Sequence, residues 1–334
     1  MVISRTPVRI SLTGGGTDFE EYFIEHGGFV ISTAINRYIY VIVKERFDRK
    51  IGVYYETSEV VNEVSEIKHD LVRETAKVAG LINGFDISIM SDIPTGGSGL
   101  GSSSSLTVGL LNAFYTYKGD SIDRDSLARK ACLIEIHKLH KPIGYQDQYI
   151  AAYGGFRSFT FLGDENMNSS VYTDEIKLPS EKIRELESNL LLYWTNTTRS
   201  SSDILTEQKA NIGTKINELD KLQEFSKELY EELIMRQNVD FVGEALNKSW
   251  LVKQQLASNI NNKRIEEMWK LAMGTGASGG KISGAGGGGF LLLYAKKEVQ
   301  NKIREALSNE FEFSFLFEPQ GSIILLNIPQ RRIK

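Results

Sequence analysis

The sequence predicts an α+β protein built from two domains, and three observations support this prediction. The chain has 334 residues, of which 41% are hydrophobic, enough for two domains of ordinary size or for one large one. Both halves contain runs with the alternation of strands and runs with the spacing of amphipathic helices. A polar, irregular segment at 164–178 separates the halves, so we place one domain at 1–175 and another at 176–334.

The elements of the first predicted domain follow from these two periodicities. Val8, Ile10 and Leu12 alternate with polar residues and predict a strand. The run 29–46 is compatible with two strands or with one long bent strand. In order, we expect strands at 2–12, 29–46, 50–64, 85–90 and 156–161, and helices at 19–25, 69–81, 106–117 and 123–140.

The second predicted domain is richer in helices. Ile265, Met268, Trp269 and Ala272, for example, share one face of a helix. We expect strands at 190–194, 290–295, 311–317 and 322–327, and helices at 203–236, 241–256, 262–273 and 298–307.

Composition and charge exclude several classes of protein. With 39 basic and 43 acidic residues, the net charge of −4 argues against a nucleic-acid binder. Cys132 is the single cysteine, which excludes an intramolecular disulfide and fits a reducing compartment. The first residues lack the apolar core of a signal peptide, and apolar runs such as 290–295 are too short to span a bilayer. We expect a cytoplasmic protein that binds small molecules, without membrane or nucleic-acid partners; the oligomeric state stays open.

A glycine- and serine-rich run at 94–105 lies between a predicted strand and a predicted helix. Glycine lets backbone N–H groups approach a ligand closely, and a helix start adds unpaired N–H donors with a partial positive charge. Such a turn suits a phosphate, although a flexible turn before a capped helix would also fit the composition. The run is neither a Walker A motif nor G-x-G-x-x-G.

This run, P-x-x-x-x-G-L-G-S-S-S-S, resembles the central motif of the GHMP kinases, usually P-x-x-x-G-L-G-S-S-A-A. It departs by one extra residue after Pro94 and by Ser104 and Ser105 in place of the alanines. The resemblance implies ATP as a substrate. It also implies a nucleotide site formed by Gly97, Gly99, Leu100, Gly101, Ser102, Ser103 and Ser104.

A second glycine run, at 14–16, follows the first strand and precedes Thr17 and Asp18. From the residues alone, a tight turn with Asp18 capping the next helix is a sufficient explanation. The stretch 7–18 resembles the first GHMP motif, whose aspartate holds the sugar in galactokinases; Gly16 replaces a histidine of that motif. The resemblance implies that Arg9 lies beside the catalytic carboxylate. It implies substrate contacts from Gly15, Gly16, Thr17 and Asp18.

Two carboxylates lie between the central motif and the predicted domain boundary. Glu135 lies on or beside the apolar side of its helix, where an unpaired carboxylate is costly, so a salt bridge to Lys138 or Arg9 would explain it. Asp147 follows a proline and a glycine in P-x-G-x-x-D and could cap a helix. By resemblance, Asp147 is the catalytic carboxylate, and Ser103 and Glu135 bind Mg²⁺. The histidines at 137 and 140 lack further ligands at zinc spacing.

The second half of the chain adds two further candidates. Arg199 lies in a hydroxyl-rich turn before a helix, where it is either a surface charge or a bidentate phosphate ligand. The run 284–289 resembles the third GHMP motif, which implies that Gly286 and Gly287 lie against the substrate.

Together the three motifs imply a GHMP kinase fold. Its N-terminal domain resembles ribosomal protein S5 domain 2, its C-terminal domain is ferredoxin-like, and the active site lies in the cleft between them. The run 5–18 and the pattern Trp250-x-x-Lys253 are most similar to the D-glycero-D-manno-heptose 7-phosphate kinases. That branch transfers the γ-phosphoryl of Mg-ATP to the anomeric hydroxyl, giving the 1,7-bisphosphate for nucleotide-activated heptose synthesis.

Two alternatives stay open at the level of the sequence. One is a GHMP kinase for an unphosphorylated sugar such as fucose or galactose, and the other is a non-catalytic sugar or nucleotide sensor. A substrate that already carries a phosphate needs a second cation, for which Arg199, Lys253 and Lys281 are equal candidates.

Overall fold

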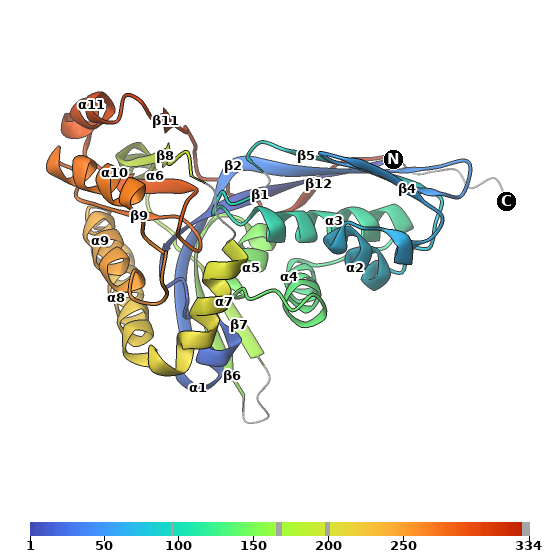
Figure 1. Cartoon of the computed structure of the whole chain (residues 1–334), viewed down its shortest axis with the longest axis horizontal. Helices are drawn as coiled ribbons and strands as arrows, with labels where there is room; N and C mark the ends of the chain where they lie inside the picture. Colours follow the sequence, from blue (N-terminus) through green and yellow to red (C-terminus); the bar gives the residue numbers. More distant parts are fainter. Residues whose placement is uncertain (95, 165–168, 198–200, 329–334) are drawn as a thin grey trace.

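The structure is a computed structural model that describes residues 1–94, 96–164, 169–197 and 201–328. Within these residues two β-sheets organise the chain (Figure 1). The first sheet has eight strands in the order β12-β1-β2-β5-β3-β4, with β6 beside β2 and β7 beside β6. They are β1 (Val2–Thr13), β2 (Gly28–Glu45), β3 (Ile51–Tyr54), β4 (Ser58–Val61), β5 (Phe85–Ser91), β6 (Phe156–Gly163), β7 (Ser169–Glu175) and β12 (Ile323–Asn327).

The strands β1 and β2 form the centre of the first sheet and pair antiparallel. Their register shifts between Pro7, which faces Tyr38, and Val8, which faces Ile35, so two residues of β2 bulge out of the pairing. Proline has no N–H to donate, which suits such a position. Of the two possibilities left open for 29–46, one long bent strand is therefore correct.

Helices cover the first sheet along one face (Figure 1). They are α2 (Asp70–Ala79), α3 (Ser102–Lys118), α4 (Arg124–Cys132) and α5 (Gln146–Tyr153), while the short α1 (Glu20–His26) follows β1. From the second half of the chain, α8 (Ile216–Arg236) and α9 (Phe241–Lys253) also pack against β1. Because β1 is covered by both groups of helices, every residue from Thr6 to Thr13 is buried.

The second sheet has the order β11-β8-β10-β9, and all its neighbours are antiparallel. Its strands are β8 (Leu190–Trp194), β9 (Gly279–Ile282), β10 (Phe290–Tyr294) and β11 (Phe311–Glu312). The remaining helices are α6 (Ser180–Asn189), α7 (Ser201–Asn211), α10 (Lys263–Gly274) and α11 (Lys297–Ala306). The strand β10 is buried at all its residues and contributes to two cores: Phe290, Leu292 and Tyr294 belong to the first, and Leu291 and Leu293 to the second.

Several expectations about the elements were wrong, among them the strands predicted at 50–64 and 311–317, which are the pair β3 and β4 and the short β11. The helix predicted at 203–236 is divided into α7, a 3₁₀ turn η3 (Ile212–Thr214) and α8, and the break contains Gly213, a poor helix former. The segment predicted to be irregular contains β7, an edge strand whose polar side chains hide its pairing with β6. The strand β9 was missed because its first two residues are glycines.

The last strand of the chain pairs with the first. After the second sheet, β12 pairs with residues 2–5 of β1, so the last strand lies beside the N-terminus (Figure 1). The change from the first sheet to the second falls between β7 and α6, at residues 176–179. The division at residue 175 stays a prediction. It does not account for β12, which comes from the second half of the chain but belongs to the first sheet.

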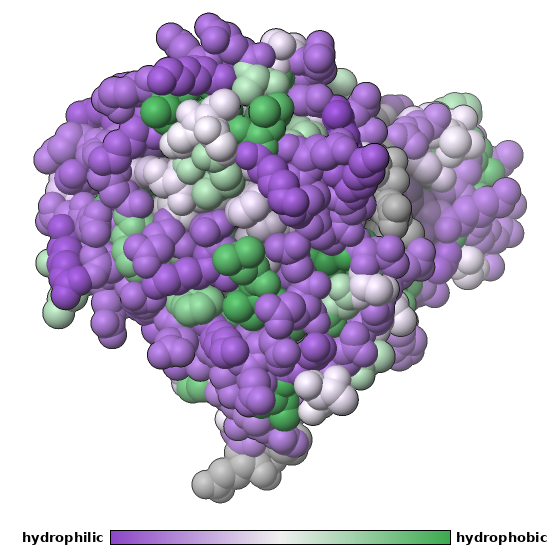
Figure 2. All heavy atoms as spheres, turned by 60° about the vertical axis from the view of Figure 1, so that its left-hand side comes forward, coloured by the Kyte–Doolittle hydropathy of each residue, from purple (hydrophilic) through white to green (hydrophobic). Residues whose placement is uncertain are grey.

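The surface carries no large apolar face in the view of Figure 2, where hydrophobic side chains form small separate groups among hydrophilic ones. Among the described helices, none combines the length and the apolar character needed to cross a membrane.

Candidate active site

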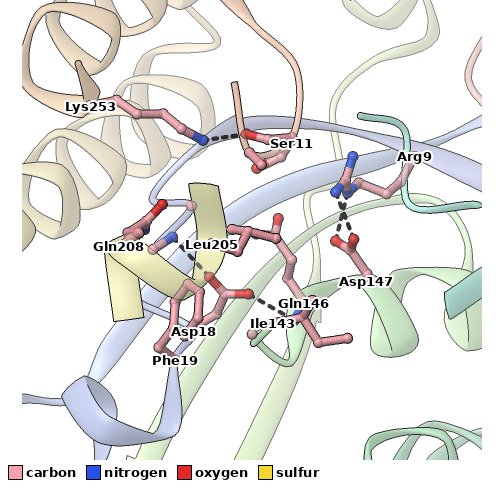
Figure 3. Close-up of a pocket in the computed structure, with 15 residues that line it drawn as sticks. Arg9, Ser11, Asp18, Phe19, Ile143, Gln146, Asp147, Leu205, Gln208 and Lys253 are labelled. Carbon is pink, nitrogen blue, oxygen red and sulfur yellow. Dashed lines mark hydrogen bonds and ion pairs between the residues drawn. The ribbon is translucent and has the colours of Figure 1, made fainter. Parts of the chain in front are cut away.

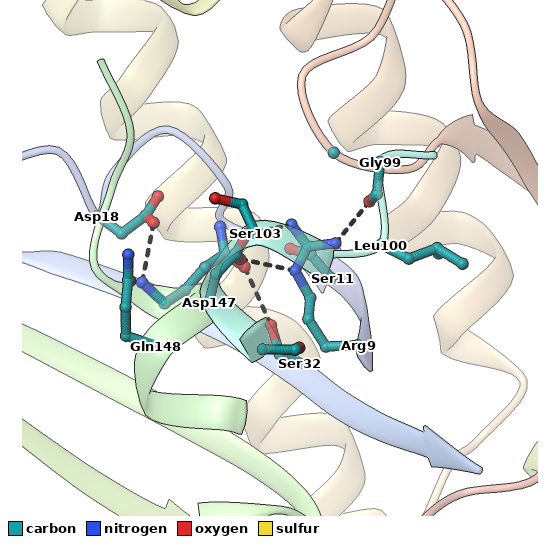
Figure 4. A network of polar contacts seen from close by, with 12 residues as sticks. Arg9, Ser11, Asp18, Ser32, Gly99, Leu100, Ser103, Asp147 and Gln148 are labelled. Carbon is teal, nitrogen blue, oxygen red and sulfur yellow. Dashed lines mark hydrogen bonds and ion pairs between the residues drawn. The ribbon is translucent and has the colours of Figure 1, made fainter. Parts of the chain in front are cut away.

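An ion pair between β1 and α5 lies at the centre of the candidate site. The Nε and Nη2 atoms of Arg9 each donate a hydrogen bond of 2.7 Å to a different carboxylate oxygen of Asp147. The third bond of the guanidinium, from Nη1, goes to the carbonyl oxygen of Gly99 at 2.6 Å (Figure 4). Bidentate pairs of this kind fix geometry as well as charge. The structure thus brings together Arg9, Asp147 and the glycine-rich loop at 96–101, here named the central loop, and Arg9 lies beside Asp147 as the resemblance implied.

The central loop leads directly into α3. Gly97, Gly99 and Gly101 have positive φ angles of 68°, 74° and 76°, a conformation that favours glycine. Gly101 precedes α3 and has no side-chain cap, so serine capping, one of the roles considered for the serines, is absent from this helix start. The hydroxyl of Ser105 donates instead to the carbonyl of Pro7. The N–H groups of the first turn therefore remain available to an anion.

The central loop packs against the third glycine run. A Cβ atom on Gly284 would lie 2.6 Å from Cα of Gly99, and one on Gly289 would lie 2.8 Å from the carbonyl oxygen of Gly97. Real Cβ atoms do not approach so closely, so the two loops require glycine at their contacts. Leu100 is fully buried beneath them, and its carbonyl accepts the N–H of Arg9. Ser102 and Ser104 lie in the first turn of α3, and Ser104 is buried.

The two predicted metal ligands touch one another. The hydroxyl of Ser103 donates to Oε1 of Glu135 at 2.5 Å, and Nε2 of Gln148 donates to Oε2 at 2.9 Å. Glu135 is fully buried and lies in a π-helical turn, η2 (Leu133–Lys138), where a continuous α-helix was predicted. Such turns are frequent at functional sites. A hydroxyl and a carboxylate are oxygen donors of the kind that Mg²⁺ prefers, so this pair fits the ion.

The cation beside Glu135 is Lys141, not Lys138 or Arg9 as predicted. Its Nζ atom lies 3.7 Å from Oε1 of Glu135 and donates to the hydroxyl of Ser103 at 3.1 Å. The chain turns back after η2 through His140, which has a positive φ of 51°, and this turn carries Lys141 to the carboxylate. Helical spacing does not reveal such a reversal.

A pocket opens next to the Arg9–Asp147 pair (Figure 3). Counting the part that is open to solvent, its space amounts to about 470 Å³. Strand β1 and the glycine run at 14–16 form one wall, and α5 and the turn before it form another. The helices α7 and α9 and the glycine run at 284–289 complete the pocket. The lining residues are Arg9, Ser11, Gly15, Gly16, Asp18, Phe19, Ile143, Gly144, Gln146, Asp147, Leu205, Gln208, Lys253, Gly284 and Ala285.

Asp18 is fixed in this pocket by backbone donors. Its carboxylate accepts the N–H of Gly16 at 2.9 Å and the N–H of Gln146 at 3.2 Å, and it does not cap α1. Burial raises the pKa of Asp18 above its usual range, and the two N–H donors oppose this shift. A carboxylate held in this way can accept hydrogen bonds from sugar hydroxyls.

Three further polar side chains line the pocket. The sequence analysis did not predict Ser11 and Gln208, and it left Lys253 as one of several candidates. Ser11 Oγ and Gln208 Oε1 are buried and have no hydrogen-bond partner, and Lys253 donates only to the carbonyl of Gly284 among the bonds of the described residues. Buried polar atoms without partners are rare in proteins and often mark a ligand site. Ser11 carried a sequence signal, because it lies two residues after Arg9 on β1. Gln208 carried none, because it reaches the pocket only through the packing of α7 beside the first half of the chain.

Some predicted substrate residues lie elsewhere. The hydroxyl of Thr17 is buried and donates to the carbonyl of Gly14 at 2.8 Å, which stabilises the turn. Gly286 and Gly287 pack on Ile260, and the N–H of Gly287 donates to its carbonyl at 2.7 Å. The third glycine run instead reaches the pocket through its first two residues. Arg199 lies outside the described residues.

Comparisons with known proteins agree with this geometry. The N-terminal domain of GHMP kinases matches residues 62–155, and the C-terminal domain of GHMP kinases matches residues 227–312. A D-glycero-alpha-D-manno-heptose 7-phosphate kinase from Campylobacter jejuni is 31% identical over 337 residues, which cover 95% of this chain and 97% of that protein.

Solved structures share the fold. A D-glycero-D-manno-heptose 1-phosphate kinase from Bacteroides thetaiotaomicron aligns with a TM-score of 0.80 at 26% identity, over 98% of this chain and 100% of that one. Lactococcus lactis galactokinase complexed with galactose aligns with a TM-score of 0.74 at 18% identity, over 96% and 94% of the two chains. The expected two-domain fold is therefore confirmed, and the chain belongs to the GHMP kinase family.

Proposed function

We propose that this protein transfers the γ-phosphoryl group of Mg-ATP to the anomeric hydroxyl of D-glycero-D-manno-heptose 7-phosphate, giving the 1,7-bisphosphate. GHMP kinases are phosphotransferases that use ATP as the phosphate donor. The observation that carries the proposal is the Arg9–Asp147 pair, which lies between the glycine loop at the start of α3 and a polar pocket. The 31% identity to the heptose 7-phosphate kinase of C. jejuni supports the choice of sugar.

Asp147 is the proposed catalytic carboxylate. Held by two bonds from Arg9, it orients the anomeric hydroxyl and accepts its proton as the hydroxyl oxygen bonds to the γ-phosphorus. The bond from that phosphorus to the bridging oxygen breaks at the same time, and ADP leaves. A positioned acid or base of this kind contributes roughly 10²- to 10⁴-fold in rate. Arg9 holds the carboxylate in place and balances negative charge.

The start of α3 and the central loop form the proposed nucleotide site. Their N–H groups supply donors for phosphate oxygens in a transfer that depends mainly on positioning and charge stabilisation. Ser103 and Glu135 would hold Mg²⁺, which neutralises charge on the phosphoryl oxygens when it is bound. Asp18 and Gln208 would bind hydroxyl groups of the sugar.

A panel of sugars tests the proposal. The purified protein is incubated with Mg-ATP and, separately, with heptose 7-phosphate, mannose 6-phosphate, fucose or galactose, and the products are identified by mass spectrometry. A bisphosphate formed only from heptose 7-phosphate supports the proposal. A monophosphate formed from fucose or galactose would retain the phosphoryl transfer and replace the substrate. If no sugar gives a product while ATP still binds, the non-catalytic sensor becomes the better description.

A further inference from the structure

Three hydrogen-bond donors converge on one point of the pocket, directly above Gly15. A Cβ atom built on Gly15 would lie 3.4 Å from Nε2 of Gln146, 3.5 Å from Oγ of Ser11 and 3.9 Å from Nζ of Lys253. These are ordinary van der Waals contact distances, so a methyl group would fit there, and the three polar atoms surround the face of Gly15 that lines the pocket.

All three groups present donors to this space. The hydroxyl of Ser32 donates to Oε1 of Gln146 at 3.1 Å, which turns the NH₂ group of the amide toward the pocket. The Ser11 hydroxyl has no partner, and it can donate to a ligand. Lys253 has three N–H donors and uses one for Gly284. A cradle of two neutral donors and one ammonium group favours an anion over a sugar hydroxyl, which must also donate its own proton.

Lys253 is the pocket cation that an anion can use. Of the cations that line the described pocket, Arg9 is fully engaged by Asp147 and Gly99, whereas Lys253 forms no salt bridge among the described residues. Lys281, the other described candidate, donates to the carbonyls of Ser11 and Leu12 at 2.9 and 3.0 Å and does not line the pocket. The choice that the sequence left open among the described cations therefore falls on Lys253.

The cradle is separate from the nucleotide side of the site. No residue between 97 and 104 lines the pocket in the described structure, and Arg9 and Asp147 lie between the central loop and the pocket. In Figure 3, Lys253 enters from α9, on the other side of the pocket from the Arg9–Asp147 pair. An anion above Gly15 therefore belongs to the sugar rather than to the nucleotide.

We propose that Ser11, Gln146 and Lys253 form a subsite over Gly15 for a phosphate group already carried by the sugar substrate. The inference rests on the proposed function, because it concerns the acceptor of the same transfer. This subsite would be the part of the pocket that distinguishes a sugar phosphate from a free sugar.

The test compares two acceptors that differ only in that phosphate: D-glycero-D-manno-heptose 7-phosphate and the same heptose without it. We would measure kcat/KM for both with Lys253→Met and with Gly15→Ala. The first variant removes the charge. The second fills the cradle with a methyl group at ordinary contact distances and at a φ angle that alanine accepts. The matched controls are Lys248→Met and Gly213→Ala. Lys248 is another lysine of α9 and pairs with Glu244. A Cβ atom on Gly213 would have no other atom within 4 Å.

A charge-assisted hydrogen bond contributes binding free energy that corresponds to a change of about 10- to 100-fold. Each test variant should therefore lose about 10- to 100-fold in kcat/KM for the phosphorylated heptose. The loss should appear mainly in KM and should be several times smaller for the free heptose, while both controls match the wild type. Equal losses on both acceptors, or a loss confined to kcat, would overturn the subsite and place Lys253 at the transferring group. A wild-type protein that phosphorylates neither acceptor would instead refute the proposed function. Because Gly15→Ala leaves every charged group in place, its result stands even if Lys253→Met folds poorly.

Discussion

The guanidinium of Arg9 contacts both carboxylate oxygens of Asp147 at 2.7 Å and the carbonyl of Gly99 at 2.6 Å. This arrangement ties the first strand of the chain, the glycine loop and α5 to one charged group. It also fixes the orientation of the carboxylate before any ligand arrives, which is the condition for positioning a hydroxyl.

Asp147→Asn should strongly reduce turnover while leaving nucleotide binding largely intact. The amide keeps the shape of the side chain and cannot accept the hydroxyl proton, so we expect a loss of roughly 10²- to 10⁴-fold in kcat. Coupled detection of ADP measures turnover, and calorimetry measures ATP binding. Asp125→Asn, at an exposed ion pair with Arg129, is the control. Wild-type turnover in Asp147→Asn would remove Asp147 from the catalytic role.

Glu135→Gln should raise the Mg²⁺ concentration required for activity. The substitution retains the size of the buried side chain and removes the carboxylate that faces Ser103. Changes around metal sites typically cost about 10- to 100-fold in metal affinity, and we expect a shift of at least this size in a Mg²⁺ titration of the initial rate. The control is Glu74→Gln, because Glu74 pairs with Arg73 and Lys77 outside the site, and this variant should leave the titration unchanged. An unchanged titration for Glu135→Gln would place the metal elsewhere.

Ser11→Ala should separate stability from binding. The Ser11 hydroxyl is buried without a partner, a state that costs about 1–3 kcal/mol, so its removal should raise the free energy of unfolding without ligand. The same removal should raise KM for the sugar phosphate. Thr13→Val is the control on the same strand, because the Thr13 hydroxyl is also buried and unpartnered but does not line the pocket. Chemical denaturation and steady-state kinetics measure the two effects, and an unchanged KM in Ser11→Ala would argue against contact with substrate.

Gly99→Ala should destabilise the protein more than Gly119→Ala. Both residues have positive φ angles, 74° and 88°, which cost an alanine about 1–2 kcal/mol. Only at Gly99 would the new Cβ also overlap the carbonyl oxygen of Ser283, whereas nothing lies within 4 Å of it at Gly119. Thermal unfolding should therefore show the larger decrease in Tm for Gly99→Ala. Equal decreases would mean that the two glycine loops are not packed together as described.

The sequence predicted the parts of the site that depend on local pattern. The resemblance of short motifs to those of the GHMP kinases placed Arg9 beside Asp147 and Gly101 in the nucleotide loop. Lys141 was missed because a reversal at His140 brings it to Glu135, and Gln208 was missed because α7 crosses from the second half of the chain. Such contacts depend on how elements distant in sequence pack, which periodicity does not contain.

The affinity for a sugar phosphate should fall as the pH rises through about 8. Burial lowers the pKa of Lys253 to about 8, with a further contribution from the nearby charge of Arg9, while Asp18 and Asp147 oppose the shift. Below this pH the ammonium form is present and can bind a phosphate, whose second pKa of about 6 keeps it dianionic. Above it the neutral amine predominates, so KM should rise toward tenfold per pH unit for heptose 7-phosphate and remain nearly level for the free heptose. Lys253→Arg, which stays charged over this range, should flatten the dependence if arginine reaches the cradle. A wild-type KM for heptose 7-phosphate that is constant from pH 7 to 9.5 would contradict a role for the Lys253 charge in binding it.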